Sequence, residues 1–145
     1  MGLNGALGIV VPIRSHEAMH DIFHGKSVHA SLAQGESTDL VAGDRIFFYD
    51  PQETRSIMGE AVIADIAFED ARGVLADFGT KLYLGEDDFK RYVSSLPEGE
   101  RSKMRVLHFK DPILYANPVK CDLPIAESGT YMTAKIFARI AKGNA

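Results

Sequence analysis

The chain has 145 residues, of which 46% are hydrophobic and 25% are charged, and its formal net charge is −4 at pH 7. These values are typical of an ordinary globular protein and predict one domain over residues 1–145, long enough to bury a core. The single cysteine, Cys121, excludes an internal disulfide and any metal site made of several cysteines.

The first apolar stretch, residues 6–13, predicts a buried strand that ends at Pro12. Eight apolar residues are too few to cross a membrane, and no basic segment precedes them as it would in a signal peptide. We therefore expect a cytoplasmic protein without a membrane partner.

Residues 15–32 predict a helix followed by a strand. Ser15 is a suitable N-cap for a helix over residues 16–24, and Gly25 is a suitable stop. The alternation that follows predicts a strand with two different faces. The buried face is made by Val28, Ala30 and Leu32, and the exposed polar face by Ser27, His29 and Ser31.

The remaining chain predicts further strands and short helices joined by turns. In order, they are strands at 44–49 and 56–66, helices near 68–77 and 86–96, strands at 103–109 and 113–120, and a helix at 131–142. Pro118 favours an edge position for the strand that contains it. Mostly antiparallel connections with short turns predict an α+β protein built on a small mixed barrel, not a doubly wound sheet.

Three short motifs resemble the PUA-like superfamily, which includes the PUA, ASCH and EVE domains. They are Gly25-Lys26 between helix and strand, Asp-Arg-Ile-Phe-Phe-Tyr at 44–49, and Gly-Glu-Ala-Val-Ile at 59–63. The nearest likeness is to a small uncharacterised archaeal family and covers almost the whole chain. The resemblance implies a mixed, mostly antiparallel pseudo-barrel with flanking helices and a helical insertion. It also implies binding of RNA or a modified nucleobase near the first helix and the strand after it.

Four polar residues are candidates for such a site. Lys26 begins a strand after a helix stop, where its amine suits a phosphate, and Ser27 adjoins it. His29 suits a base edge, and Glu60 begins an apolar strand face that points toward a pocket. Exposed residues without a role would show the same pattern.

The resemblance also implies an alternative with catalysis. Some ASCH-like proteins hydrolyse an acylated cytosine nucleoside with a lysine, a threonine three residues later and a glutamate. Lys26 matches the lysine and Glu60 is a candidate for the acid, but the threonine position holds His29. Because of this departure, we expect binding without catalysis.

Basic residues gather late in the chain: residues 101–145 carry 8 lysines and arginines against 3 acids, whereas residues 1–100 carry 8 against 17. Arg105 and Lys110 lie in the predicted strands of this basic part and are candidates for phosphate contacts. The other cations of the group are Arg101, Lys103, Lys120, Lys135, Arg139 and Lys142. An ordinary solvated surface would have the same composition.

Residues 16–20, His-Glu-Ala-Met-His, have the spacing of a zinc-binding helix in metalloproteases. The predicted helix is short, however, and no third ligand follows at the required distance. We therefore expect His16, His20 and His24 to form an exposed stripe, and we expect neither a metal nor another cofactor.

The lead hypothesis is thus a module that binds RNA or a modified nucleoside without catalysis, through Lys26, Ser27, His29, Glu60, Arg105 and Lys110. The alternative is an amidohydrolase acting on a modified nucleoside with Lys26 and Glu60. A weaker alternative is a protein–protein adaptor, which predicts a contiguous exposed apolar patch and no polar pocket under Lys26.

Overall fold

The computed structural model describes residues 8–32, 40–97 and 104–121, together with 124–126, 129–132, 135, 137, 138 and 142. The strands are β1 (Gly8–Pro12), β2 (Val28–Leu32), β3 (Arg45–Asp50), β4 (Ser56–Glu69), β5 (Met104–Lys120) and β6 (Thr130–Tyr131). The helices are α1 (His16–Ile22), α2 (Ala71–Phe78), the 3-10 turn η2 (Gly79–Lys81) and α3 (Glu86–Ser94).

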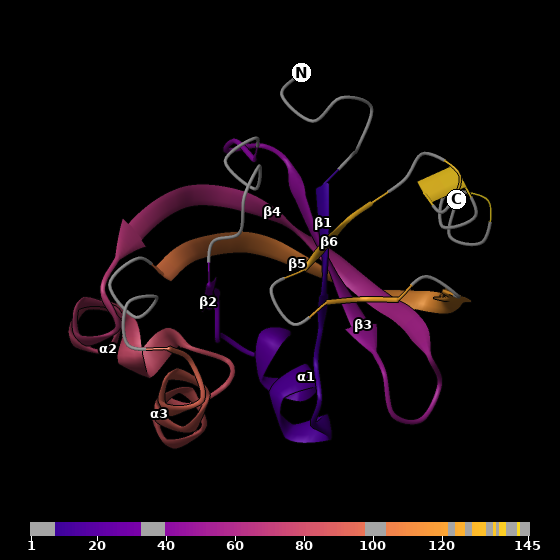
Figure 1. Ribbon diagram of the computed structural model, residues 1–145. Coiled ribbons are helices and arrows are strands. Elements are labelled where there is room, and N and C mark those ends of the chain that lie inside the picture. The colour runs from indigo at the N-terminus through magenta and orange to yellow at the C-terminus, as the bar shows by residue number, and fades with distance from the viewer. Residues whose placement is uncertain are drawn as a thin grey trace.

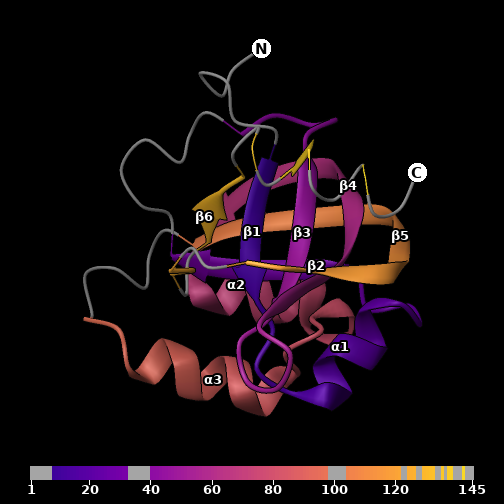
Figure 2. The same cartoon turned by 90° about the vertical axis from the view of Figure 1, so that its right-hand side faces the viewer.

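The strands form one curled sheet in the order β2-β5-β4-β3-β1-β6. The pairing of β1 with β3 is parallel, and the other neighbouring pairs are antiparallel. The long strands β4 and β5 bend over the molecule as a half-barrel (Figure 1), and α1 and α3 lie at the lower end of β1 and β3 (Figure 2). The predicted α+β class and mostly antiparallel pseudo-barrel are confirmed.

The helices begin where local capping groups allow. The Ser15 side chain accepts a hydrogen bond from the Ala18 N–H at 3.0 Å, as predicted, and Asp70 accepts one from Gly73 at 2.7 Å at the start of α2. Within the described part of the chain, no helix is long and apolar enough to cross a membrane.

Three predicted elements are corrected. The strands expected at 103–109 and 113–120 are one strand, β5, interrupted by a register shift and by Asp111 with φ 54°. The helix expected from residue 131 does not start there, because Thr130–Tyr131 pair with β1 as β6. Residues 135, 137, 138 and 142 are helical, and the rest of that prediction lies outside the described residues.

The third correction concerns β2, whose polar face is not exposed. His29 and Ser31 are 6% and 2% exposed, as buried as Val28 and Ala30 on the other face. Val28 and Ala30 pack on a cluster with Phe89 of α3, whereas His29 and Ser31 turn toward the interior of the half-barrel. Both faces are covered because helices lie outside this part of the sheet and the rest of the barrel lies inside.

Candidate functional site

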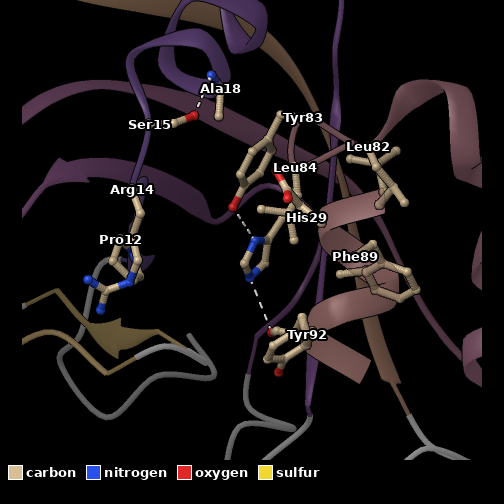
Figure 3. Close-up of a pocket in the computed structure, with 14 residues that line it drawn as sticks. Pro12, Arg14, Ser15, Ala18, His29, Leu82, Tyr83, Leu84, Phe89 and Tyr92 are labelled. Atoms are coloured by element: carbon tan, nitrogen blue, oxygen red, sulfur yellow. Dashed lines mark hydrogen bonds between the residues drawn. The ribbon is translucent and has the colours of Figure 1, made fainter. Parts of the chain in front are cut away.

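A cavity of about 270 Å³ lies along the open edge of β2, between α1 and α3. Its walls come from three segments that are far apart in sequence: Pro12, Arg14, Ser15 and Ala18; Val28, His29, Ala30 and Ser31; and Leu82, Tyr83, Leu84, Asp88, Phe89 and Tyr92. His29 lies in the middle of this group, between Arg14 and Phe89 (Figure 3). Mostly apolar walls with a few convergent polar groups are typical of a small-molecule site.

The polar part of the cavity wall is a short hydrogen-bonded chain centred on His29. Its Nδ1 is bonded to the Tyr83 hydroxyl and its Nε2 lies 3.2 Å from Ser31 Oγ. The rings of His29 and Tyr83 are nearly parallel, with centroids 5.7 Å apart. The chain fixes the orientation of the imidazole, since both ring nitrogens are engaged.

His29 is uncharged at physiological pH. Burial, and in second place the positive charge of Arg105, lower the pKa of His29 from 6.5 to about 3. His29 therefore offers the cavity a neutral hydrogen-bonding group, and a histidine with so low a pKa is a weak general base.

The cavity exists because the chain that borders β2 turns away from it. Leu82 forms a bridge with Val28, and the Tyr83 N–H donates to the Val28 carbonyl at 3.4 Å. Gly85 then adopts φ 84°, a conformation that favours glycine, and α3 begins. The edge of β2 beyond Val28 is left facing the cavity.

A second, polar hollow of about 560 Å³ adjoins the cavity and shares Ser15, Ala18, Leu82, Tyr83, Leu84 and Asp88 with it. It is lined by five carboxylates, those of Glu17, Asp21, Glu86, Asp87 and Asp88, and by the cations Lys26 and Arg91. The Lys26 ammonium donates to the Thr80 carbonyl, and Arg91 pairs with Asp88 at 2.9 Å. The mouth of the site is therefore predominantly negative.

The structure brings two of the six predicted site residues to these hollows: His29 lines the cavity and Lys26 lines the polar hollow. Ser27 is half-buried and its carbonyl accepts from the Phe109 N–H at 2.9 Å. Lys110 is exposed on β5, opposite Val62 of β4, and lines neither hollow.

Arg105 does not belong to a surface patch of cations, which corrects that expectation. It is 1% exposed, lies opposite Ser31 in the pairing of β2 with β5, and hydrogen-bonds Tyr131. Its charge acts on the site from inside the protein, through its effect on His29.

Glu60 lies in a different network. Its carboxylate accepts a hydrogen bond from the Tyr115 hydroxyl at 2.7 Å and pairs with Arg45 at 3.2 Å. Burial and this hydrogen bond raise the pKa of Tyr115 well above its usual value. Glu60 lines neither hollow, so Lys26 and Glu60 are not assembled around one cleft.

His16 and His20 of α1, and His24 just after it, are exposed, as predicted. The rings of His20 and His24 stack with centroids 3.9 Å apart, and His16 lies 3.0 Å from a Glu53 oxygen. Among the described residues, no group of three or more histidines, cysteines or acids has a geometry suited to a metal ion.

Sequence reasoning did not find the segment at residues 82–84, which borders β2 and supplies Tyr83. The run Leu-Tyr-Leu-Gly stands between two predicted helices and was assigned to neither. A short apolar run that ends in glycine is a signal for a bridging strand segment, and this signal was available.

A family model described as "Domain of unknown function (DUF365)" matches residues 6–134. Among solved structures, ASCH from Zymomonas mobilis is similar, with a TM-score of 0.75, 14% identity, and 96% of each chain covered. A serine-to-alanine mutant of that Zymomonas mobilis protein gives 0.77 and 15% identity, with 97% of this chain and 99% of that chain covered. No curated protein matches. These likenesses confirm the predicted ASCH-type, PUA-like fold; the relation to an archaeal family stays a prediction.

Proposed function

This chain belongs to the family described as Domain of unknown function (DUF365), and we propose that it is a PUA-like module that binds RNA or a modified nucleobase without catalysis of its own. The cavity beside His29 carries this proposal. It combines apolar and aromatic walls with the neutral chain Tyr83–His29–Ser31, which suits a flat, uncharged, hydrogen-bonding ligand. Its volume, about 270 Å³, is just below the ~300–1,000 Å³ typical of small-molecule sites.

The charges at the mouth favour a base or nucleoside over a polynucleotide backbone at this point. Five carboxylates line the polar hollow and two cations oppose them, so a phosphate that entered it would meet net repulsion. Lys26, the candidate for a phosphate contact, is engaged by the Thr80 carbonyl. RNA would therefore be bound through a single base turned out of its strand.

The positions of the two candidate catalytic residues also support binding over hydrolysis. Lys26 lines the polar hollow, whereas Glu60 is held by Arg45 and Tyr115 and lines neither hollow. An amide hydrolase needs its base, its nucleophile and its oxyanion donors around one reacting carbon. The polar hollow at Lys26 equally weakens the adaptor alternative, which expects no such pocket.

The test is calorimetric titration of the protein with uridine, cytidine, adenosine, guanosine and a short single-stranded RNA. We expect saturable binding of at least one of them. Leu84 is half-buried and lines both hollows, so Leu84→Trp fills the site. This variant should weaken binding by about tenfold or more, equivalent to about 1.4 kcal/mol.

The control is Leu75→Trp, which places the same ring at a half-buried leucine of α2 outside both hollows. It should bind the nucleoside with the same affinity as the unmodified protein, and its melting temperature should be similar. Absence of binding to every nucleoside and to RNA would overturn the proposal. So would turnover of an N4-acylated cytidine that Lys26→Ala or Glu60→Gln abolishes, because the protein would then be an enzyme.

A further inference from the structure

The backbone of β2 presents one residue to the cavity through its hydrogen-bonding groups. In an antiparallel pair, residues alternate between those that bond the partner strand and those whose N–H and C=O point away from it. The Phe109 N–H donates to the Ser27 carbonyl, so the bonded pairs with β5 continue at His29 and Ser31. The N–H and C=O groups of Val28, Ala30 and Leu32 therefore point to the open edge, where Val28 and Ala30 line the cavity.

Of these two residues, Val28 already has a partner on that side, because its carbonyl accepts from Tyr83 in the bridge with Leu82. The bordering chain then leaves β2 at Gly85. Ala30 lines the cavity, and no hydrogen bond among the described residues engages its outward N–H and C=O. A donor and an acceptor on one residue thus face the cavity side by side.

We propose that Ala30 reads the pairing edge of an unpaired base through this backbone N–H and C=O. The inference rests on the proposed function and names the part of the ligand that is recognised. The pairing edges of uracil, cytosine, adenine and guanine all carry a donor next to an acceptor. Such an edge forms two hydrogen bonds with one strand residue, in the manner of a neighbouring strand.

The same geometry disfavours a peptide as the occupant. Peptides that extend a sheet bond to several successive outward residues of an edge strand. Here the outward carbonyl of Val28 is engaged and Leu32 does not line the cavity, so Ala30 alone among the outward residues of β2 has both groups open there. The cavity is also bounded by α1 and α3 on either side. One open residue suits a small ring with a two-atom edge.

Two hydrogen bonds to the Ala30 backbone would discriminate among modified bases. A substituent on the pairing edge abolishes one of the two bonds and collides with β2, whereas a substituent on the opposite edge points away from Ala30. Bases modified at the 5-position of a pyrimidine are thus accepted, and bases methylated on the pairing edge are rejected.

Two pairs of methylated nucleosides test the proposal with the unmodified protein. The first pair are isomers, 3-methyluridine, methylated on the pairing edge, and 5-methyluridine, methylated on the opposite edge. The second pair are N4,N4-dimethylcytidine, whose two methyl groups leave no amino hydrogen on the pairing edge, and 5-methylcytidine. For whichever parent binds, we expect the nucleoside methylated on its pairing edge to bind about tenfold to a hundredfold more weakly, from the loss of one or two hydrogen bonds. Equal affinities within a pair would overturn the inference and leave the proposed function standing.

A second measurement follows the backbone itself. The Ala30 amide hydrogen, which faces the cavity, should exchange with solvent rapidly in the free protein and slowly at saturation with the nucleoside. The Ser31 amide is the internal control, since it already bonds β5 and should be protected in both states. Saturation without any change at Ala30 would overturn the inference. No binding of any nucleoside would overturn the proposed function with it, and protection of Ala30 by an added peptide instead would assign the edge to a protein partner.

Discussion

His29 is a buried imidazole whose charge state is set by its surroundings. Both ring nitrogens have hydrogen-bonding partners in Tyr83 and Ser31, and Arg105 contributes positive charge nearby. Protonation would place a second cation in the interior, which is why the pKa of His29 falls to about 3. The unfolded chain lacks these surroundings, so its histidine titrates near 6.5.

The first prediction at this scale is an acid-dependent loss of stability. Between pH 6.5 and 3 the unfolded state binds a proton at His29 and the folded state does not, so the free energy of unfolding falls as the pH falls. The contribution is fully present above pH 6.5, and about 2 kcal/mol of it is lost between pH 7 and pH 5. Denaturant titrations at the two pH values measure it.

The variant His29→Gln keeps a hydrogen-bonding side chain but cannot titrate. Its free energy of unfolding should therefore fall by about 2 kcal/mol less between pH 7 and pH 5 than that of the unmodified protein. His16→Gln removes an exposed histidine from α1, and its free energy of unfolding should fall with pH as much as that of the unmodified protein. Identical pH dependence in His29→Gln and the unmodified protein would show that His29 titrates normally in the folded state.

At the scale of elements, the sequence was informative wherever the determinants are local. Ser15 caps α1 as predicted, and the strands predicted at 44–49 and 56–66 correspond to β3 and β4 within a few residues. The sequence was uninformative where the structure of a segment depends on residues that are distant in the chain. Whether a polar face such as that of His29 and Ser31 is exposed depends on what covers it, and alternation within β2 does not record that.

The continuity of β5 is another case of this kind. The pattern at residues 103–120 was interrupted at Asp111-Pro112, which predicted two strands. The structure passes through this point with Asp111 at φ 54°, and β4 shifts register to follow. The register shift makes this point a bulge within one strand. Aspartate suits the position because it tolerates the left-handed conformation better than most residues.

The second prediction concerns that bulge. Asp111→Val should lower the free energy of unfolding by about 1–2 kcal/mol, because a branched side chain is disfavoured at positive φ. Asp111→Gly should be nearly neutral, since glycine adopts this conformation freely. If the segment were regular strand, the order would reverse, because valine favours strands and glycine weakens them. Chemical denaturation of the two variants decides between these outcomes.

At the scale of the whole molecule, the candidate site is a product of the fold. The β1–α1 connection, β2 and the segment from η2 to α3 meet at the cavity, although about 70 residues of sequence separate the first from the last. Sequence reasoning identified one of them, β2, through His29 and the neighbouring Lys26, and the family resemblance pointed to the first helix beside it. Sequence reasoning did not identify the segment from η2 to α3. The run at residues 82–85 signals a strand segment, but not its bridge to Val28, which is a contact between distant parts of the chain.

The same assembly sets the electric field at the site, from which the last prediction follows. Glu17 and Asp21 of α1 meet Glu86, Asp87 and Asp88 of α3 around the polar hollow. A nucleoside 5′-monophosphate should therefore bind about threefold to tenfold more weakly than its nucleoside at low salt, from a repulsion of about 1 kcal/mol in a watery environment. The difference should shrink at 1 M salt, where the screening length is about 3 Å.

Charge-removing variants then locate the source of the repulsion. Asp87→Asn removes an exposed charge from the hollow and should narrow the difference between nucleoside and monophosphate. Asp65→Asn changes the net charge by the same amount, but it removes an exposed acid of β4 that lines neither hollow. The difference in affinity between nucleoside and monophosphate should therefore persist in this variant. A monophosphate that binds more tightly than its nucleoside would instead mean that Lys26 leaves the Thr80 carbonyl to take the phosphate, and that the acids at the mouth do not govern entry.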